Sequence, residues 1–424
     1  MTRENVGVAA VQQGSVRVLV LAESLPYPTL KGGDLRTWQN VNALAAFVRV
    51  GVFGLCSNDS RRDVVPALPL ACWAASTDPA LTVPPPLGVR LAAREWLLDA
   101  AGHPSDLLYS DVAARELAAV LRSFRPDVVL IEGLWLHGYI DTVRLAGCRA
   151  VLDCQNVEAA VFRELARTDA RQGLEGRVLR EVLPVRTEAL ERRAVRRADQ
   201  IWVCSEEDEC RLREAYDPAA SVVVVPNAVR LEDYTPATAR EEQPPAAPLT
   251  VLFPGIFSYR PNALAAQFLV EEVLPRLVAA GAACRLLLVG PMPTPELLAA
   301  AARDARIVVT GPVRDVRPYF AAATVLAVPL FQGGGTRMKI LEAFASGLPV
   351  VSTAKGAEGL HACDGTHLLI AETAGDFAEA VLSLWRDPAR GRQLAARARA
   401  LVAERFTWDS VGPRVRRAVA ALGV

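Results

Sequence analysis

The chain has 424 residues, 51% of them hydrophobic, which is enough for two domains of ordinary size with a core in each. Its 47 basic and 47 acidic side chains give a formal net charge of zero. No broad surface for nucleic acid is therefore predicted, and small molecules are the favoured partners. Length and composition exclude a single small binding module.

The cysteines and the N-terminus indicate where the protein resides. The eight cysteines form no CxxC pair and no cluster at zinc-ligand spacing, a pattern typical of reduced thiols. The first 15 residues contain no long apolar core, so we expect no signal peptide. No run of 18 apolar residues predicts a transmembrane helix. We therefore expect a cytoplasmic protein.

In the first half of the chain, short apolar runs alternate with segments that favour helix. The run at 17–22 is followed by a turn-rich loop and by a helical pattern from about 35 to 47. Further apolar runs lie at 48–55, 127–133, 149–156, 199–206 and 221–227. Such runs separated by helices predict a parallel sheet covered on both faces. The segment 241–248, "EEQPPAAP", is interpreted as a linker because its prolines and charges bury little.

The second half shows the same alternation of apolar runs and helical segments, which predicts a second doubly wound sheet. Its apolar runs lie at 249–255, 284–290, 306–311, 324–330, 348–353 and 366–371. Residues 262–280 form a helical pattern that starts at a capping Asn262 and stops at a glycine, and the chain after about 372 is helical. Ligands of open parallel sheets bind at the carboxyl ends of the strands, so two such domains facing each other define a cleft.

Three consecutive glycines, at 333–335, come directly after an apolar run and directly before a helix. They let backbone N–H groups approach a ligand closely, and the helix N-terminus adds partial positive charge, so the loop suits an anionic ligand. A tight turn without a ligand is the alternative. The P-loop signature and a GxGxxG after the first strand are both absent, which argues against kinase-like ATPases and dinucleotide dehydrogenases.

Glu342 lies in the middle of the helix that follows the glycines, with apolar residues on nearly every side. A buried carboxylate without partners is destabilising. The side chain therefore needs donors such as Lys339, backbone amides or ligand hydroxyls. The alternative is a surface pair between Lys339 and Glu342, three residues apart, which contributes little to stability.

Residues 330–353, "LFQGGGTRMKILEAFASGLPVVST", resemble the donor-site signature of glycosyltransferase family four, in a branch whose loop reads GGGTRxKxLEA. The resemblance extends through "VTGPVRDVRPYFAAATVLAVPL", "GAEGL", "DCQNVE", "ERRAVRRADQIWVCSEED" and "VVPNAVRLEDY". It implies the α/β GT-B fold, in which two Rossmann-like doubly wound domains face a cleft and C-terminal helices cross back. The implied parts are an acceptor domain, a linker, a nucleotide-sugar donor domain and a C-terminal helix that packs back toward the first domain, at 1–230, 231–248, 249–405 and 406–424.

The resemblance also implies how a nucleotide-sugar donor binds. In the family, the glutamate equivalent to Glu342 accepts hydrogen bonds from the ribose hydroxyls, which gives this residue its place in the catalytic site. The loop amides hold the sugar and the diphosphate. The donor-binding residues implied in this way are Gly333, Gly334, Gly335 and Thr336 in the loop, and Val313 and Asp315 near the base.

Two positions depart from the family pattern. Many members carry a second glutamate that contacts the transferred sugar, where this chain has Gly334 and therefore no side chain. Ile256 stands where an arginine commonly neutralises the diphosphate, and the substitutes are Arg260, Arg337 and Lys339. A departing diphosphate needs a cation or a helix terminus to stabilise it. We expect Arg337 and Lys339 to be catalytic in this sense and Arg260 to bind the donor, with a solvated arginine as the alternative.

A second glycine pair lies in the first domain. Gly32 and Gly33, with Lys31 and Arg36 beside them, resemble the family's flexible glycine loop, which meets the donor phosphates and the acceptor across the cleft. The alternative is a surface turn in which Asp34 caps a helix.

Two further residues of the first domain are expected to bind the acceptor. His137 lies where the family often places a histidine near the anomeric carbon, which makes it a catalytic candidate, with a structural histidine as the alternative. Gln155 replaces the histidine of the family's DxHNVE pattern. A glutamine can hydrogen-bond an acceptor but cannot titrate.

No metal and no cofactor is expected, because there is no Asp-x-Asp motif and the four histidines lie far apart. Helix dipoles and basic side chains would replace a cation. The arginine-rich helices over 161–198 leave two alternatives, a weak peripheral membrane contact and a solvated face.

Together these features predict a glycosyltransferase of the hexosyltransferase type. It would move a sugar from a UDP-, GDP- or dTDP-sugar to an acceptor hydroxyl by positioning the reactants and stabilising the diphosphate. Retention of the anomeric configuration is implied by the resemblance. A nucleotide-sugar 2-epimerase of the same fold and a catalytically silent nucleotide-sugar binding protein are the alternatives.

Overall fold

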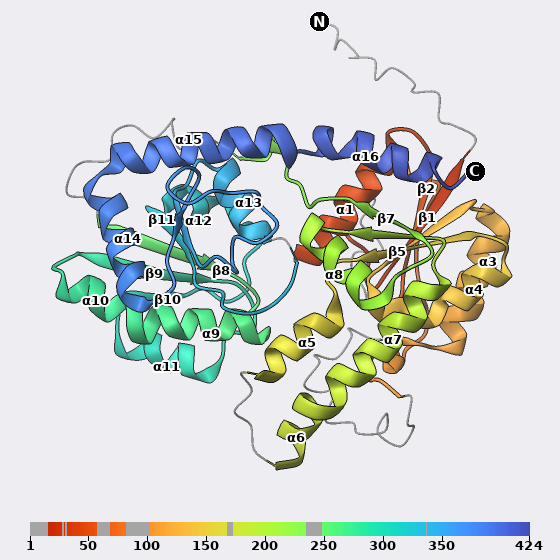
Figure 1. The fold of residues 1–424 in the computed structure, drawn as a ribbon, viewed down its shortest axis with the longest axis horizontal. Helices are drawn as coiled ribbons and strands as arrows, with labels where there is room; N and C mark the ends of the chain where they lie inside the picture. Colours follow the sequence, from red (N-terminus) through yellow and green to blue (C-terminus); the bar gives the residue numbers. More distant parts are fainter. Residues whose placement is uncertain are drawn as a thin grey trace, which may run out of the picture.

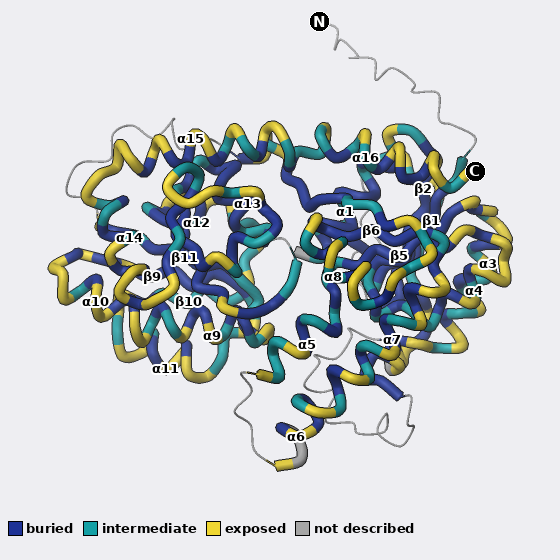
Figure 2. Tube along the Cα trace, in the orientation of Figure 1, coloured by how far each residue is buried: buried dark blue, intermediate teal, exposed yellow. Residues whose placement is uncertain are grey.

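The computed structural model describes residues 16–27, 29, 32–56, 68–81, 102–167, 173–234, 248–335 and 337–424. Two lobes lie side by side, each built on one sheet flanked by helices, and helices near the C-terminus run along one side of both lobes (Figure 1). Buried residues concentrate in the strands at the centre of each lobe (Figure 2). None of the described helices is both long enough and apolar enough to cross a membrane.

The first lobe is built on a parallel sheet in the order β3-β2-β1-β4-β5-β6-β7. Its strands are β1 (Arg17–Ala22), β2 (Arg49–Gly54), β3 (Cys72–Ala75), β4 (Val128–Glu132), β5 (Arg149–Cys154), β6 (Gln200–Val203) and β7 (Ser221–Val224). Every apolar run predicted for this half is a strand. The sequence analysis did not predict the edge strand β3, because its four residues are only half-buried and form no continuous apolar run.

Helices flank this sheet, and they include the arginine-rich segment. They are α1 (Gly32–Ala45), α3 (Asp111–Phe124), α4 (Ile140–Leu145), α5 (Glu158–Arg167), α6 (Gly173–Arg177), α7 (Leu183–Arg197) and α8 (Glu206–Tyr216), with the short turns η3 (Pro104–Leu108), η4 (Leu134–Tyr139), η5 (Val178–Val182) and η6 (Leu231–Asp233). The helix expected from about 35 begins at Gly32. Gly32 and Gly33 are therefore helical, and Asp34 lies inside the first turn, where a carboxylate favours the helix N-terminus.

The second lobe is built on a parallel sheet in the order β10-β9-β8-β11-β12-β13. Its strands are β8 (Leu249–Pro254), β9 (Cys284–Val289), β10 (Ile307–Val309), β11 (Val325–Val328), β12 (Val350–Ser352) and β13 (Leu369–Ile370). Each coincides with an apolar run predicted for this half. The flanking helices are α9 (Arg260–Phe268), α10 (Leu274–Ala279), α11 (Pro295–Arg303), α12 (Arg317–Ala322), α13 (Met338–Ala345) and α14 (Ala374–Arg386).

The single helix expected over 262–280 is interrupted. A π-helical turn, η8 (Leu269–Val273), separates α9 from α10. The helix begins at Arg260, so the expectation that Asn262 caps it is wrong, and the Asn262 side chain makes other contacts described below. The predicted end is confirmed, because Gly281 follows with a φ angle of 77°, which favours glycine.

The last two helices connect the lobes. α15 (Pro388–Arg405) packs against α13 of the second lobe, and α16 (Trp408–Ala420) packs against α1 of the first. Val411 and Val415 of α16 are buried with Val18 and Val20 of β1 in one apolar cluster. The predicted fold, two doubly wound domains with C-terminal helices crossing back, is confirmed. The predicted domain bounds stay predictions, and residues 235–247 of the expected linker lie outside the described residues.

Candidate functional site

The glycine loop joins β11 to α13. Gly333 and Gly335 have φ angles of 105° and 73°, a region that residues with a Cβ rarely adopt. A Cβ at Gly333 would also come within 2.9 Å of the Tyr259 hydroxyl. Both the backbone conformation and the space around the loop therefore favour glycine at these positions.

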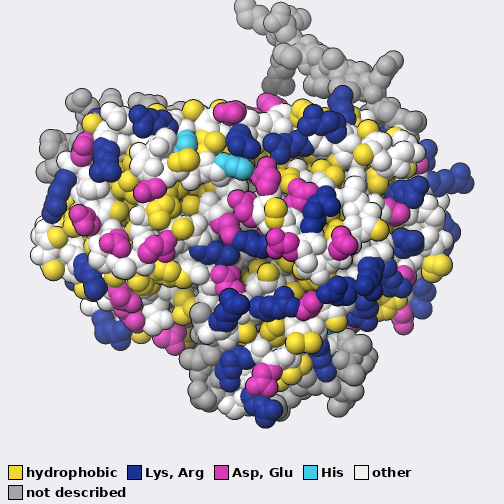
Figure 3. Space-filling model, in the orientation of Figure 1, with side chains coloured by type: hydrophobic (Ala, Val, Ile, Leu, Met, Phe, Trp, Pro, Cys, Tyr) yellow, Lys and Arg dark blue, Asp and Glu magenta, His cyan; other side chains and the backbone are white. Residues whose placement is uncertain are grey.

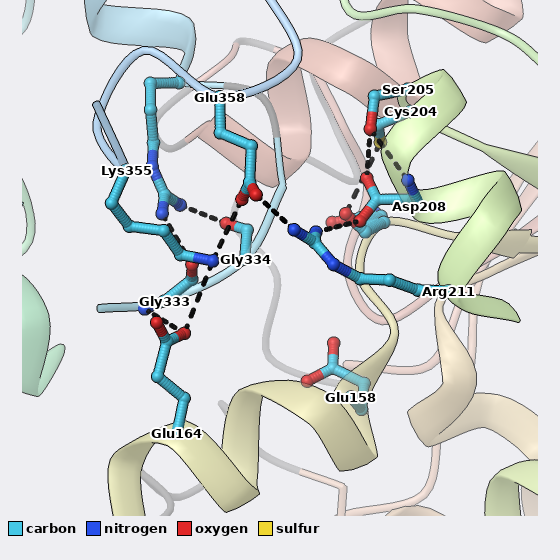
Figure 4. A network of polar contacts seen from close by, with 12 residues as sticks. Glu158, Glu164, Cys204, Ser205, Asp208, Arg211, Gly333, Gly334, Lys355 and Glu358 are labelled. Carbon is cyan, nitrogen blue, oxygen red and sulfur yellow. Dashed lines mark hydrogen bonds and ion pairs between the residues drawn. The ribbon is translucent and has the colours of Figure 1, made fainter. Parts of the chain in front are cut away.

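The first lobe covers this loop. The Gly333 N–H donates a 3.0 Å hydrogen bond to Oε2 of Glu164 in α5, as Figure 4 shows. A Cβ at Gly334 would lie 2.6 Å from Cγ2 of Val161 and 2.7 Å from Oδ1 of Asn156. The glycine loop thus lies at the boundary between the lobes, where the sequence predicts a cleft.

Arg337 holds the shape of the loop from within. Its Nη2 donates a 2.7 Å hydrogen bond to the carbonyl oxygen of Gly333, and its Nη1 donates to the carbonyl oxygen of Gly334. The side chain is buried, and burial lowers the pKa of the guanidinium. The predicted cation is therefore adjacent to the loop, where it is bonded to loop carbonyl groups.

Lys339 lies two residues after Arg337, at the start of α13. Its Nζ donates a 2.9 Å hydrogen bond to Oδ1 of Asn262 and lies 4.1 Å from the centre of the Phe253 ring. Burial, together with the nearby charge of Arg337, lowers the pKa of the ammonium to about 7. A small change in the surrounding charge can therefore alter its protonation near neutral pH.

Glu342 is buried in the middle of α13, with 8% of its surface exposed. The Tyr234 hydroxyl donates a 3.0 Å hydrogen bond to its Oε1. Burial raises the pKa of the carboxyl to about 7, although the hydrogen bond from Tyr234 and the charge of Lys339 oppose the rise. The alternative of a surface pair between Lys339 and Glu342 is wrong because of this burial.

Tyr234 is a site residue that the sequence analysis did not identify. It lies directly after η6, 108 residues before Glu342 in the chain. The available signal was its position in "VVPNAVRLEDY", a segment that resembles the family. Nothing in the sequence pairs it with Glu342, because that contact depends on how the segment after β7 packs into the core of the second lobe.

The other predicted donor residues lie around α13 and the start of α9. Asp315 is in the loop between β10 and α12, and its negative charge contributes to the raised pKa of Glu342, so the two carboxylates face the same region. Val313 is in the same loop, Arg260 is the first residue of α9, and Thr336 lies outside the described residues.

Gln155 links the start of α1 to the glycine loop. A Cβ at Gly33 would lie 3.7 Å from Oε1 of Gln155, and a Cβ at Gly335 would lie 3.0 Å from its carbonyl oxygen. Gly32, the first residue of α1, directly precedes Gly33. The structure thus brings together residues from both lobes that the sequence analysis placed in one site.

His137 lies in η4, and its described contacts come from the same lobe. Its Nε2 is 3.4 Å from Oδ1 of Asp106 and 3.4 Å from the Ser105 hydroxyl, both in η3. The imidazole keeps 19% of its surface exposed. A contact between His137 and the acceptor stays a prediction.

Arg36 lies near the glycine pair of α1 in the sequence, but it is not a cation available to a ligand. It is 2% exposed, and its Nε donates a 2.7 Å hydrogen bond to Oδ2 of Asp153 at the end of β5. Its Nη1 donates to Oδ1 of Asn227 at 2.9 Å. A buried and fully paired arginine of this kind holds the lobe together. Lys31 lies outside the described residues.

A cavity of about 250 Å³ lies beside the glycine loop, between the lobes. Its walls come from α5 and α8 of the first lobe and from the glycine loop and the segment after β12 of the second. The lining residues are Val157, Ala160, Val161, Arg163, Glu164, Arg167, Asp208, Arg211, Gly333, Gly334 and Lys355.

Ion pairs connect the lobes around this cavity (Figure 4). Lys355, after β12, lies 3.5 Å from Glu164 of α5 and 2.9 Å from Glu358. Arg211 of α8 pairs with the same Glu358. Arg211 also lies 3.4 Å from Asp208 within α8. These partly exposed pairs are screened by salt, so they hold the two lobes together most strongly at low ionic strength.

Basic side chains gather over the arginine-rich helices. On the face shown in Figure 3, Lys and Arg form a band over α5, α7 and α8, with acidic side chains between them. Glu188 of α7, for example, pairs with Arg163 and, at 2.9 Å, with Arg192. This mixture is typical of a solvated face, and a peripheral membrane contact stays a prediction.

Within the described ranges, no group of three or more His, Cys, Asp or Glu side chains is arranged to hold a metal ion. The cysteines in these ranges are all free thiols.

Two family models match the sequence. "Glycosyl transferase 4-like domain" matches residues 15–228, and "Glycosyl transferases group 1" matches residues 248–387. The chain therefore belongs to the glycosyltransferases that these families describe, and its two lobes form a GT-B enzyme. No curated protein matches the sequence significantly.

Solved structures share this fold over nearly the whole chain. Sucrose-phosphate synthase from Thermosynechococcus elongatus has a TM-score of 0.75 and 18% identity, over 96% of this chain and 99% of its own. Anabaena Alr3699/HepE in complex with UDP-glucose has a TM-score of 0.65 and 14% identity, over 96% and 99%. A glycosyltransferase from Rickettsia africae has a TM-score of 0.63 and 11% identity, over 96% and 98%. At such identities the likeness concerns the fold.

Proposed function

We propose that this glycosyltransferase moves a hexose from a nucleotide diphosphate donor to an acceptor hydroxyl, with retention at the anomeric carbon. The observation that carries the proposal is Glu342, a buried carboxylate that already accepts a hydrogen bond from a hydroxyl group, that of Tyr234. Ribose hydroxyls offer the same kind of donor. The glycine loop, which suits a diphosphate, lies directly before the helix of Glu342.

The chemistry follows from these positions. The bond between the anomeric carbon and the diphosphate oxygen breaks as the acceptor oxygen bonds to the same carbon from the same face. The proton of the acceptor hydroxyl passes to the departing phosphate oxygen. We assign no enzymic nucleophile, so the protein acts by positioning the reactants and by stabilising the diphosphate charge with Arg337, Lys339 and the helix N-terminus. The cavity beside Gly334 is the proposed place of the acceptor.

The experiment that tests the proposal is a donor panel. UDP-, GDP- and dTDP-hexoses are incubated with candidate acceptors, and NMR identifies the anomer of the product. UDP-hexoses are tested first, because Anabaena Alr3699/HepE was solved with UDP-glucose. A 2-epimerase would instead convert the donor without an acceptor. A silent binding protein would show stabilisation by about 2.7 kcal/mol at one hundred times the dissociation constant without any turnover.

Activity should persist in excess EDTA. The sequence has no Asp-x-Asp motif, and the buried Arg337 and the half-buried Lys339 at the loop offer charge for the diphosphate without a metal. Turnover is measured after chelation and again after adding magnesium or manganese. Loss of turnover with EDTA and recovery with either ion would contradict the metal-independent reading.

His137→Ala should lower turnover by about a hundredfold, the scale of a misplaced reactant, and should leave nucleoside diphosphate affinity unchanged. The reason is that its proposed partner is the acceptor rather than the nucleotide. Calorimetry and steady-state kinetics separate the two effects. His367→Ala, in the segment before β13, is the control. Normal turnover combined with weaker nucleotide binding would show that His137 is structural.

We also propose that the protein acts in the cytoplasm. Its thiols are free throughout the described ranges, as is typical of a reducing compartment. Fractionation of cells expressing the full chain tests this, and recovery in the membrane pellet at low salt only would favour the peripheral membrane contact instead.

A further inference from the structure

One carboxylate oxygen of the first lobe is held by two donors of the second. Oε2 of Glu164 in α5 accepts a 3.0 Å hydrogen bond from the Gly333 N–H and lies 3.5 Å from Nζ of Lys355 (Figure 4). A backbone N–H and an ammonium group can only donate. The glycine loop and the segment after β12 therefore form an anion site, and Glu164 occupies it.

Glu164 can leave this site. Its side chain keeps 28% of its surface exposed, so the carboxylate can turn toward water, which hydrates it in place of the two donors. Glu164, Gly333 and Lys355 all line the cavity between the lobes. An anionic group of a ligand in this cavity can take the same two donors, and its charge repels the carboxylate of Glu164.

The cavity brings further cations to this place. Among the described residues, four basic and two acidic side chains line it, the basic ones being Arg163, Arg167, Arg211 and Lys355. Glu358, which is not part of the lining, lies 2.9 Å from Lys355 and also pairs with Arg211. One carboxylate outside the cavity thus positions two cations that come from different lobes.

These donors suit a phosphate group better than a carboxylate. A phosphate monoester has three charged oxygens, so it can accept from the Gly333 N–H, from Lys355 and from an arginine of the first lobe at once. A carboxylate has one oxygen fewer. Arg337 and Lys339, the cations proposed for the donor diphosphate, do not line this cavity. The phosphate that fits here is therefore separate from those of the donor.

We infer that the acceptor carries a phosphate group, which binds in this cavity to the Gly333 N–H and to Lys355 in place of Glu164. The inference rests on the proposed function, which places the acceptor in the cavity. It makes Lys355 an acceptor-binding residue and Glu164 a competitor that holds the site until the acceptor binds.

Calorimetry with inorganic phosphate at low ionic strength tests the site. The nucleoside diphosphate preferred in the donor panel is kept saturating, so that phosphate does not bind in the donor site. Lys355→Met should bind phosphate about tenfold more weakly than the wild type, the scale of one charge-assisted hydrogen bond. Lys355→Arg keeps the charge and should bind it as the wild type does. If Lys355→Met does not fold, Lys355→Gln replaces it with the same expected loss.

Glu164→Gln should have the opposite effect and bind phosphate about tenfold more tightly. The amide oxygen of glutamine accepts more weakly from the Gly333 N–H than a carboxylate does, and it carries no charge to attract Lys355. Opposite signs in the two variants distinguish competition for one site from a general loss of structure.

Glu206→Gln is the matched control for the loss of a contact between the lobes. Oε2 of Glu206 in α8 lies 2.9 Å from Nε2 of His361 in the segment after β12, and neither residue lines this cavity. This variant should bind phosphate as the wild type does.

Two further ligands identify the source of the phosphate. Glycerol 3-phosphate represents a soluble acceptor, and vesicles of phosphatidic acid in phosphatidylcholine represent a lipid acceptor. The source is the ligand whose binding falls about tenfold in Lys355→Met. The inference is overturned if the Lys355 variants bind phosphate as the wild type does, if Glu164→Gln binds it more weakly, or if acetate binds as tightly as phosphate. Binding of phosphate through Lys355 without turnover of any donor would instead refute the proposed function.

Discussion

Lys339→Met should lower turnover at saturating donor by about 10²–10³-fold. The ammonium group lies in the first turn of α13, between Asn262 and the Phe253 ring, and burial already lowers its pKa to about 7. A departing diphosphate gains negative charge, so the protonated lysine becomes more favourable as the bond breaks and stabilises the transition state. Methionine keeps the volume and the contact with the aromatic ring but removes the charge.

Steady-state kinetics and calorimetry measure this effect. Lys339→Met should bind the free nucleoside as the wild type does and the nucleoside diphosphate more weakly. Arg303→Met, at the exposed end of α11, removes the same charge from the same lobe and should change neither quantity. Unchanged turnover in Lys339→Met would mean that the lysine only fills space beside Phe253.

Glu342→Gln should bind a nucleoside diphosphate about tenfold more weakly and yet be more stable than the wild type at pH 8. The pKa of Glu342 is raised from 4.5 to about 7, so the folded protein binds this proton more tightly than the unfolded chain. The wild type therefore loses stability as the pH rises from about 4.5 to 7. Glutamine stays neutral and can still accept from Tyr234. The gain should be about 1–3 kcal/mol at pH 8 and should disappear near pH 4.

Denaturant unfolding between pH 4 and 8 measures the stability difference. Glu358→Gln is the control of opposite sign, because its ion pairs with Arg211 and Lys355 lower the pKa of Glu358 despite desolvation. That carboxylate contributes stability above its unfolded pKa, so the control should be less stable than the wild type at pH 8. Full nucleotide affinity in Glu342→Gln would reject the ribose role and leave Glu342 as a structural group.

Most of the fold could be predicted because buried parallel strands are continuous apolar runs. The runs at 127–133 and 324–330, for example, became β4 and β11, each buried along its whole length. The misses have local physical causes. β3 is a half-buried edge strand without a clear run. The π-helical turn η8 lies just before Pro275 in the first turn of α10, and this proline, which cannot donate a backbone hydrogen bond, is a signal that the prediction of one continuous helix overlooked.

The part of the candidate site that lies within one short segment of the chain could be predicted from the sequence. The glycines at 333–335 and Glu342 lie within a single strand–loop–helix unit, and a carboxylate in an apolar helix demands a partner. Their partners were not predictable. Tyr234, Glu164 and Asn156 reach this unit from distant parts of the chain, and a single sequence contains no information on such contacts.

α16 determines the order in which the protein can be completed during synthesis. Val411 and Val415 fill the core of the first lobe beside Val18, and Gln200 of β6 donates a 3.0 Å hydrogen bond to the carbonyl oxygen of Ala418. The whole second lobe leaves the ribosome before this helix does. Domains commonly fold from the N-terminus during translation, but here the first lobe keeps an apolar surface uncovered until the second lobe has been made. The second lobe can therefore complete its hydrophobic core before the first lobe does, although it is synthesised later.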